Sequence, residues 1–155
     1  MKNTAIALEN SLSFITKHMP PDAIDWWVIG SAAIAISTDI DIVPKDVDIV
    51  ANTKSIKAFL QNAGEPLAQS VAHPLFKSFP FQRIAVENGI AVEVMGDLKL
   101  KDKTHGWQPL CIRTRQTVMF GKTTVYVPAI EEQIEILKRF GRSKDLEKVK
   151  LINAR

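Results

Sequence analysis

Short helical and short extended patterns alternate along the whole chain, and this alternation limits the fold more than any single motif does. Apolar residues recur at steps of three and four from Ala5 to Met19, which predicts a helix over residues 4–18 that ends at Pro20-Pro21. Trp26 to Ile29 is a run of good strand formers. Such a chain is expected to form a compact layered fold in which helices pack against a sheet.

Breakers and turn residues divide the rest of the chain. Gly64 suits the left-handed position after a helix, and Asn88-Gly89 between two apolar runs is a strong hairpin signal. A second hairpin is expected to turn at Gly121-Lys122. The predicted helices cover residues 32–36, 53–63, 129–140 and 143–153, the strands cover 26–29 and 47–51, the hairpins cover 81–96 and 117–127, and residues 38–45, 65–80 and 97–115 are predicted to be loops.

Length and composition fit one soluble domain. The 155 residues are 46% hydrophobic and 24% charged, so one domain over residues 1–155 is long enough to bury a core. Cys111 is the one cysteine, which excludes an internal disulfide and suggests a reducing, cytoplasmic setting; we expect it to be a buried free thiol. No apolar run approaches the ~20 residues of a membrane span, and the N-terminal segment turns acidic too early for a secretory signal.

The most informative pattern is Asp46-Val47-Asp48 in the predicted strand 47–51 and the residues before it. Side chains two residues apart on a strand share a face, with Cα atoms about 7 Å apart. Two carboxylates on one face repel each other unless a cation lies between them. Pairs of Mg²⁺ ions held in this way serve phosphoryl and nucleotidyl transfer, whereas a lone pair of this kind is more often a solvated strand edge.

A second pair, Asp39 and Asp41, precedes the first and is an alternative metal pair. We favour Asp46 and Asp48, because the apolar run around them continues into a helix. Asp39 and Asp41 instead run into Pro44, which disfavours a central strand.

Gly30-Ser31 lies between a predicted strand and a predicted helix. A glycine there lets the backbone approach a phosphate closely, and the helix N-terminus offers free N–H groups and a positive dipole end. The Ser31 hydroxyl has two readings: it donates to the same phosphate, or it caps the helix.

Glu93 lies among apolar residues in the second strand of the Asn88-Gly89 hairpin. Burying a carboxylate there is costly without a cation or a hydrogen-bond donor. The alternative is a water-exposed sheet edge with Arg83 or a lysine as partner.

Taken together, Ile29-Gly30-Ser31, the Asp46 to Ile49 segment and Glu93 resemble the signature of the DNA polymerase β-like nucleotidyltransferase superfamily. The resemblance covers residues 26–95, and the hairpin and helices over 116–153 are compatible with small stand-alone bacterial members. The gap between Ser31 and Asp46 is somewhat longer than usual. The resemblance implies an α+β nucleotidyltransferase fold with a mixed β-sheet, helices mainly on one face and short C-terminal helices.

The resemblance also implies roles for these residues. Asp46 and Asp48 would ligate two Mg²⁺ ions, and Glu93 would complete the metal site or help to deprotonate the acceptor. Gly30 and Ser31 would hold the nucleotide phosphates. The expected reaction transfers a nucleoside monophosphate from an NTP to an acceptor hydroxyl and releases pyrophosphate; the alternative is a non-catalytic module that binds nucleotide or a partner on the same fold.

The segment from Phe140 to Ile152 resembles a lysine–aspartate element of small nucleotidyltransferases, including type IV toxin–antitoxin toxins and aminoglycoside-type enzymes. By that resemblance Lys144 reaches the triphosphate and Asp145 positions it. The alternative reading makes Ser143 a helix cap and both residues a solvated first turn.

The partners expected from the resemblance are an NTP and an acceptor that is a small molecule, a protein hydroxyl or a tRNA end. A helical RNase-type partner protein and a homodimer are further expectations, and no membrane partner is expected. An exposed apolar patch involving Trp26, Phe76, Phe79 or Trp107 is the predicted dimer surface. A candidate basic surface for a nucleic-acid acceptor consists of the lysine-rich run 99–103 together with Arg113, Arg115 and Lys122; the alternative is that these are merely solvated loops.

Overall fold

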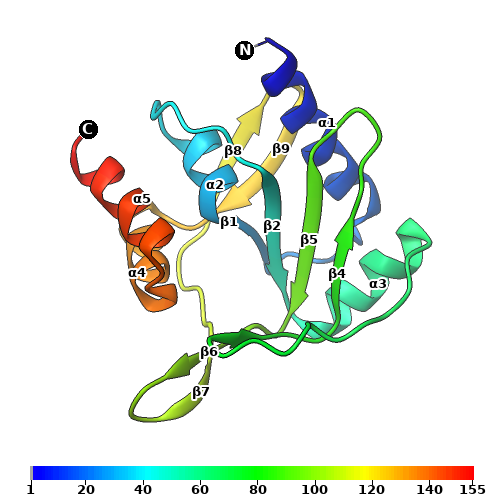
Figure 1. Cartoon of the computed structure of the whole chain (residues 1–155). Helices are drawn as coiled ribbons and strands as arrows, with labels where there is room; N and C mark the ends of the chain where they lie inside the picture. Colours follow the sequence, from blue (N-terminus) through cyan, green and yellow to red (C-terminus); the bar gives the residue numbers. More distant parts are fainter. Residues whose placement is uncertain (1) are drawn as a thin grey trace.

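The computed structural model describes residues 2–155 (Figure 1). Helices and strands alternate only up to residue 63 rather than along the whole chain; a run of strands follows between residues 76 and 127, and two helices come last. The helices and strands in this part of the chain are α1 (Lys2–His18), β1 (Trp26–Ile29), α2 (Gly30–Ser37), β2 (Asp46–Ala51), α3 (Thr53–Ala63), β3 (Phe76–Lys77), β4 (Phe81–Ile84), β5 (Ala91–Gly96), β6 (Lys99–Asp102), β7 (Gly106–Pro109), β8 (Gln116–Phe120), β9 (Thr123–Val127), α4 (Ile130–Phe140) and α5 (Ser143–Asn153). All five predicted helices are confirmed: six of their ten ends agree, and the other four are shifted by one or two residues.

The central sheet has the strand order β1-β2-β5-β4. Strands β2 and β5 run parallel, while β1–β2 and β4–β5 are antiparallel, so the sheet is mixed as expected. Asp48 lies opposite Glu93 in the parallel pair, and Ile29 lies opposite Asp48 in the antiparallel pair. This register brings three separate sequence segments to one place on the sheet.

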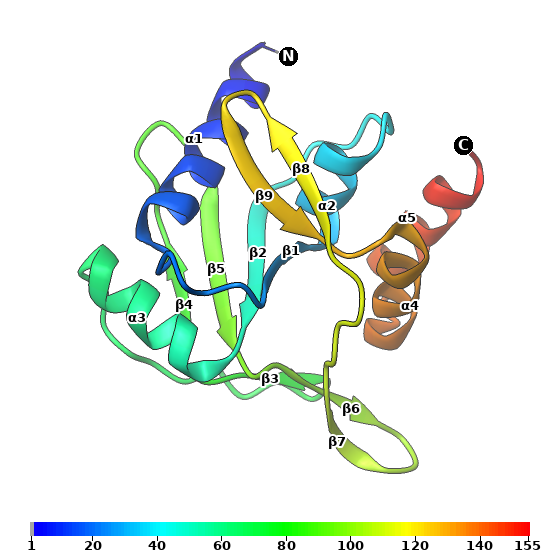
Figure 2. The same ribbon diagram turned by 180° about the vertical axis from the view of Figure 1, so that it is seen from behind.

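The two faces of the sheet differ because strand side chains alternate. Val47 and Ile49 of β2, and Val92 and Val94 of β5, are fully buried in the main core. Helices α1 and α3 and the β8–β9 hairpin cover that face (Figure 2). The acidic residues of β2 and β5 lie on the opposite face. The α+β class and the helices gathered mainly on one face are therefore confirmed.

Helices α4 and α5 pack against each other at the side of the sheet, next to α2 (Figure 1). Ile34 of α2 forms a small core with Leu137 of α4 and with Val149 and Ile152 of α5. Because these side chains are nearly fully buried, they hold the C-terminal helices beside the start of α2.

For the hairpin predicted over residues 81–96, the two strands are confirmed but the predicted turn is wrong. A two-residue Asn88-Gly89 turn would pair residue 84 with residue 93, whereas the structure pairs Ile84 with Val92 and leaves residues 85–90 as a loop. The buried hydroxyl of Ser11 on α1 bridges to this loop, donating to the Ile90 carbonyl at 2.6 Å and accepting from the Ile90 N–H at 2.8 Å. Tertiary contact with α1 therefore outweighs the local turn preference.

Three other expectations are wrong. Residues 97–115 are not a plain loop, because β6 and β7 form a hairpin there that pairs with β3. Cys111 is exposed rather than buried. Trp26 is only 4% exposed and packs in the core, so it takes no part in an exposed apolar patch. In the described part of the chain, no helix combines the length and apolar character that a membrane crossing needs.

Candidate functional site

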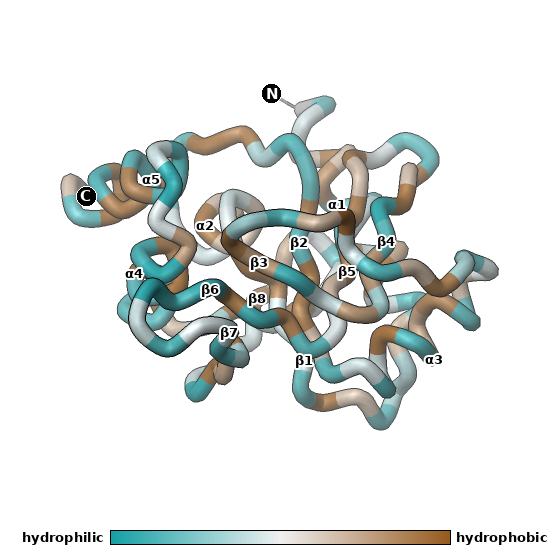
Figure 3. Tube along the Cα trace, turned by 60° about the horizontal axis from the view of Figure 1, so that its bottom comes forward, coloured by the Kyte–Doolittle hydropathy of each residue, from teal (hydrophilic) through white to brown (hydrophobic). Residues whose placement is uncertain are grey.

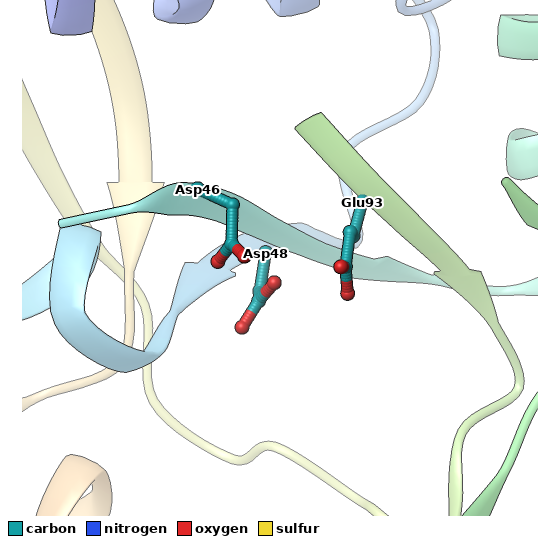
Figure 4. Close-up of side chains that lie close together, drawn as sticks. All are labelled: Asp46, Asp48 and Glu93. Carbon is teal, nitrogen blue, oxygen red and sulfur yellow. The ribbon is translucent and has the colours of Figure 1, made fainter. Parts of the chain in front are cut away.

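Three carboxylates converge on the open face of the sheet. Asp46 and Asp48 project from β2 and Glu93 projects from the neighbouring β5, each only partly exposed (Figure 4). One ligand oxygen from each residue lies within 4.8 Å of the other two. The strand period of two places the aspartates on one face, and the parallel register places Glu93 opposite Asp48. Such a cluster is the ligand type that hard divalent cations prefer.

Gly30 lies directly against this cluster. Its φ angle is +73°, a conformation that favours glycine, and a Cβ atom there would lie 3.4 Å from Oδ2 of Asp48. Helix α2 begins at Gly30, and no side chain caps the N–H groups of its first turn. These groups and the helix dipole give the site a positive edge beside its negative cluster.

A pocket of about 540 Å³ contains all seven residues that the sequence predicts for the site. They are Gly30, Ser31, Asp46, Asp48, Glu93, Lys144 and Asp145. The sheet and α2 form one wall, and the α4–α5 pair forms the opposite wall. The fold therefore brings residues from both ends of the chain together.

The α5 wall differs from the simple capping interpretation. Arg142, not Ser143, is the N-cap residue of α5, and Asp145 is buried rather than solvated, with 2% of its surface exposed. Asp145 accepts two hydrogen bonds from the Arg142 guanidinium, at 2.7 and 3.1 Å, and one from the Arg142 backbone N–H. The guanidinium also lies over Phe140 and Phe76. Asp145 thus holds the Arg142 side chain at the pocket wall. Lys144, two residues after Arg142, is exposed.

The charges in the pocket perturb each other. Burial, followed by the charges of Asp46 and Glu93, raises the pKa of Asp48 to about 7, although Lys148 and Arg142 oppose this shift. Burial also lowers the pKa of Lys148. Oδ1 of Asp48 has no hydrogen-bond partner among the described residues. A buried carboxylate oxygen without a donor, beside two further carboxylates, fits a divalent cation.

Arg83 is the basic group nearest to the acidic cluster. Its guanidinium lies 3.1 Å from Oδ2 of Asp46 and 2.5 Å from Oε1 of Glu93, because Arg83 stands opposite Glu93 on β4. Hydrogen bonds to these two carboxylates raise the pKa of Arg83. Arg83 is therefore one of the partners that the sequence analysis named for Glu93 at a sheet edge. It contacts Asp46 as well.

Asp39 and Asp41, the alternative metal pair, are both exposed on the loop between α2 and β2. Neither lines the pocket of the acidic cluster. Among the described residues, the group with metal-ligand geometry is Asp46, Asp48 and Glu93. The geometry thus favours the pair in the strand over the pair in the loop.

Several solved structures share this architecture. A Thermotoga maritima protein assigned as a nucleotidyltransferase superimposes with a TM-score of 0.69 at 19% identity, over 96% of this chain and 91% of that one. The chain has the nucleotidyltransferase fold. The antibiotic-resistance factor ANT(2'')-Ia matches this fold with a TM-score of 0.52 at 10% identity, over 97% of this chain and 83% of that one. The lincosamide antibiotic adenylyltransferase LnuA matches with a TM-score of 0.50 at 11% identity, over 83% and 85% of the two chains. No family model and no curated protein matches the sequence.

Sequence reasoning missed some residues of this nucleotidyltransferase-fold pocket. Lys45, Arg142 and Lys148 add positive charge to its lining, and Phe76 and Phe140 add aromatic surface. Arg142 lies two residues before Lys144, and Lys148 lies four residues after it. This spacing of basic residues around the lysine–aspartate pair is a sequence signal that could have identified both. Phe76 lies in a proline-rich stretch whose local pattern carries no such signal.

Proposed function

We propose that this chain transfers a nucleoside monophosphate from an NTP to an acceptor hydroxyl and releases pyrophosphate, with Mg²⁺ as cofactor. The observation that carries the proposal is the pocket itself. In one nucleotidyltransferase fold it joins three converging carboxylates, an uncapped helix N-terminus at a glycine, and a wall of basic side chains. Negative and positive groups are thus separated as a metal-bound triphosphate requires.

Asp46, Asp48 and Glu93 are the residues that would hold Mg²⁺, and the unpartnered Oδ1 of Asp48 supports this assignment. Bound Mg²⁺ supplies charge neutralisation for the triphosphate and activation of the attacking hydroxyl. Two ions are proposed, as for the superfamily that the sequence resembles.

The other pocket residues bind and orient the nucleotide. The free N–H groups at Gly30 and Ser31 are suited to donate to phosphate oxygens. Lys144 and Lys148 face them from α5 and carry the opposite charge to the triphosphate. Asp145 positions Arg142 through its paired hydrogen bonds rather than touching the nucleotide itself.

The acceptor class stays open at this level. LnuA and ANT(2'')-Ia are named for antibiotics, so a small-molecule acceptor is one proposal. The partner protein and the homodimer expected from the resemblance also stay predictions.

Calorimetric titration of each NTP with Mg²⁺ tests the proposed function. Wild type is expected to bind at least one NTP only when Mg²⁺ is present, and Asp48→Asn is expected to lose that binding while keeping its fold. Asp41→Asn is the matched control, since Asp41 is an exposed aspartate outside the pocket, and it is expected to behave as wild type. Equal binding by wild type and Asp48→Asn would refute the metal assignment. Binding without any pyrophosphate release in an acceptor screen would favour the non-catalytic module.

A further inference from the structure

A second and larger hollow lies beside the hairpin that the sequence did not predict. It has a volume of about 770 Å³ and is formed by the segment 69–79, the start of α3 and the hairpin β6–β7. Figure 3 looks onto this end of the molecule, where β3, β6 and β7 form their own small sheet across the end of the central one. We call this hollow the hairpin groove. It shares no lining residue with the pocket of the acidic cluster, which we call the nucleotide pocket after its proposed ligand.

The hairpin groove is basic. Lys77 and Lys99 line it, Lys101 follows on β6, and Lys57 reaches it from α3 over the Phe79 ring. None of these four exposed lysines forms an ion pair with another described residue. The groove's one acidic lining residue, Asp97, accepts a hydrogen bond from the Thr53 hydroxyl at 2.6 Å. The uncompensated positive charge favours an anionic ligand.

Aromatic rings are interleaved with these charges. Trp107 lines the groove and lies under the ammonium groups of Lys77 and Lys101, at 4.7 and 5.1 Å from the ring centre. Phe79 is 38% exposed in the same groove. Lysines beside partly exposed rings suit a ligand that combines phosphates with flat bases, as single-stranded nucleic acid does. A cationic small molecule would be repelled by the same lysines.

Two further features concern the ligand of the groove and its position: one favours a polar ligand, and the other relates the groove to the nucleotide pocket. The buried hydroxyl of Ser78 lines the groove and has no hydrogen-bond partner among the described residues. His73 of the groove stacks on Phe76, with ring centres 3.8 Å apart, and Phe76 lines the nucleotide pocket. One pair of stacked rings therefore joins the lining of the groove to the lining of the pocket.

We propose that the hairpin groove binds single-stranded nucleic acid and presents its 3′ end to the nucleotide pocket as the acceptor. The acceptor role rests on the proposed function, whereas the binding does not. In the transfer, the 3′ oxygen forms a bond to the α-phosphorus of the NTP, and the bond from that phosphorus to the bridging oxygen of the β-phosphate breaks. Pyrophosphate leaves with that electron pair, and the hydroxyl proton passes to a carboxylate of the acidic cluster. The product is a strand one nucleotide longer.

Fluorescence anisotropy with a labelled single-stranded RNA of about 12 nucleotides tests the binding. The triple variant Lys77→Gln, Lys99→Gln, Lys101→Gln is expected to bind at least tenfold more weakly, and its affinity should depend less steeply on salt, by about two in the log–log slope. Trp107→Ala is expected to lose about tenfold through lost stacking, and Trp107→Phe to recover most of it. The matched control replaces three exposed lysines elsewhere, Lys17, Lys122 and Lys138, and should bind as wild type.

The same titration on Asp48→Asn separates this proposal from the proposed function, because RNA binding should survive the loss of the metal site. Single-stranded DNA of the same sequence and heparin are the comparison ligands. Absence of RNA binding, or binding that the triple lysine variant retains, would overturn the proposal. Heparin binding of equal strength together with no effect of Trp107→Ala would also overturn it, in favour of a general polyanion surface. Lengthening of the bound RNA by one nucleotide in wild type, lost in the triple variant, would support the acceptor role.

Discussion

Burial beside two other carboxylates makes the charged form of Asp48 unfavourable. Its carboxyl has a pKa of about 7 in the folded protein against 3.8 for the unperturbed group, because it is buried beside Asp46 and Glu93. Between these two pH values the folded state binds more protons than the unfolded state, so stability falls as pH rises from about 4 to about 7. The charged form is therefore tolerated in the metal-free protein at a cost.

The first prediction follows from that cost. Asp48→Asn is expected to stabilise the metal-free protein at pH 8 by about 2 kcal/mol, since each pKa unit is worth ~1.4 kcal/mol and solvent screens part of the shift. The melting temperature should rise by about 4–8 °C. At pH 4 the gain should nearly vanish. Thermal melts with chelator present measure it, with Asp41→Asn as the unchanged control; a variant that melts below wild type at pH 8 would contradict it.

Arg83 is a basic residue that partly offsets the negative charge of the acidic cluster. With its guanidinium between Asp46 and Glu93, it acts as a counter-ion for two of the three carboxylates. Because Arg83 is half exposed, each contact is worth only about 0.5–1 kcal/mol. A divalent cation bound by the same carboxylates would compete with it.

The second prediction is that Arg83→Gln lowers the melting temperature of the metal-free protein by about 2–8 °C, because the two contacts together are worth about 1–2 kcal/mol. The same variant should show a larger rise than wild type when Mg²⁺ is added, because the carboxylates lack their internal cation. Melting with and without Mg²⁺ measures both effects. Lys150→Gln is the control, since it breaks an exposed ion pair with Glu147 outside the pocket and should leave the Mg²⁺ response unchanged. An unchanged Mg²⁺ response in Arg83→Gln would show that the arginine does not compete.

The sequence predicts these residues unevenly. Asp46 and Asp48 follow from the strand period, and Glu93 from a carboxylate among apolar neighbours. The contact of Arg83 with Asp46 depends on how β4, β5 and β2 pair, and this pairing is set by loop 85–90 and its contact with α1 rather than by the turn sequence. Local pattern identifies candidates, and register decides which of them meet.

At the scale of elements, the hairpin β6–β7 was missed for a physical reason. Of β6 and β7, only Leu100 is buried, so the segment lacks the apolar alternation by which strands are recognised. Its pairing with β3 stabilises it instead. By contrast, the β8–β9 hairpin alternates more clearly and turns at Gly121, and it was predicted within one residue of its bounds.

Glu132 fastens helix α4 to the segment that precedes β8. Its carboxylate is 4% exposed and accepts hydrogen bonds from the N–H groups of Arg113 and Thr114 at 2.8 and 2.7 Å, and from the Thr114 hydroxyl. Burial alone would raise the pKa of Glu132, but these hydrogen bonds outweigh it and lower the pKa. The α4 wall of the pocket depends on this attachment.

The third prediction is that Glu132→Gln destabilises the protein by about 2 kcal/mol at pH 7, because buried donors lose a charged acceptor. The melting temperature should fall by about 4–8 °C. A carboxyl with a lowered pKa stabilises the fold above its unfolded value of 4.5, and that stability is lost as pH falls through the folded pKa. The difference in melting temperature between Glu132→Gln and wild type should therefore become smaller in acid. The neighbouring exposed Glu131→Gln is the control; an equal effect of both variants would argue against the attachment.

For the whole molecule, local patterns predicted the elements but not their assembly. The lysine–aspartate pair lies about 50 residues after Glu93, and nothing near it in sequence indicates which sheet edge it faces. Ile34 of α2 packs with Leu137 and Val149, and this small core places α5 across from Gly30. The pocket thus lies between two walls that this small core joins.

The fourth prediction concerns those two walls. An NTP with Mg²⁺ should bridge them, so hydrogen exchange should slow both in β2 and in α5; at 100 times Kd the stabilisation reaches ~2.7 kcal/mol, up to about a hundredfold in exchange rate. Lys144→Gln should lose the protection of α5, whereas Lys150→Gln, on the same helix but outside the pocket, should keep it. Asp48→Asn should lose protection in both elements. Protection confined to β2 in wild type would mean that the nucleotide does not reach α5, and the roles of Lys144 and Lys148 would have to be withdrawn.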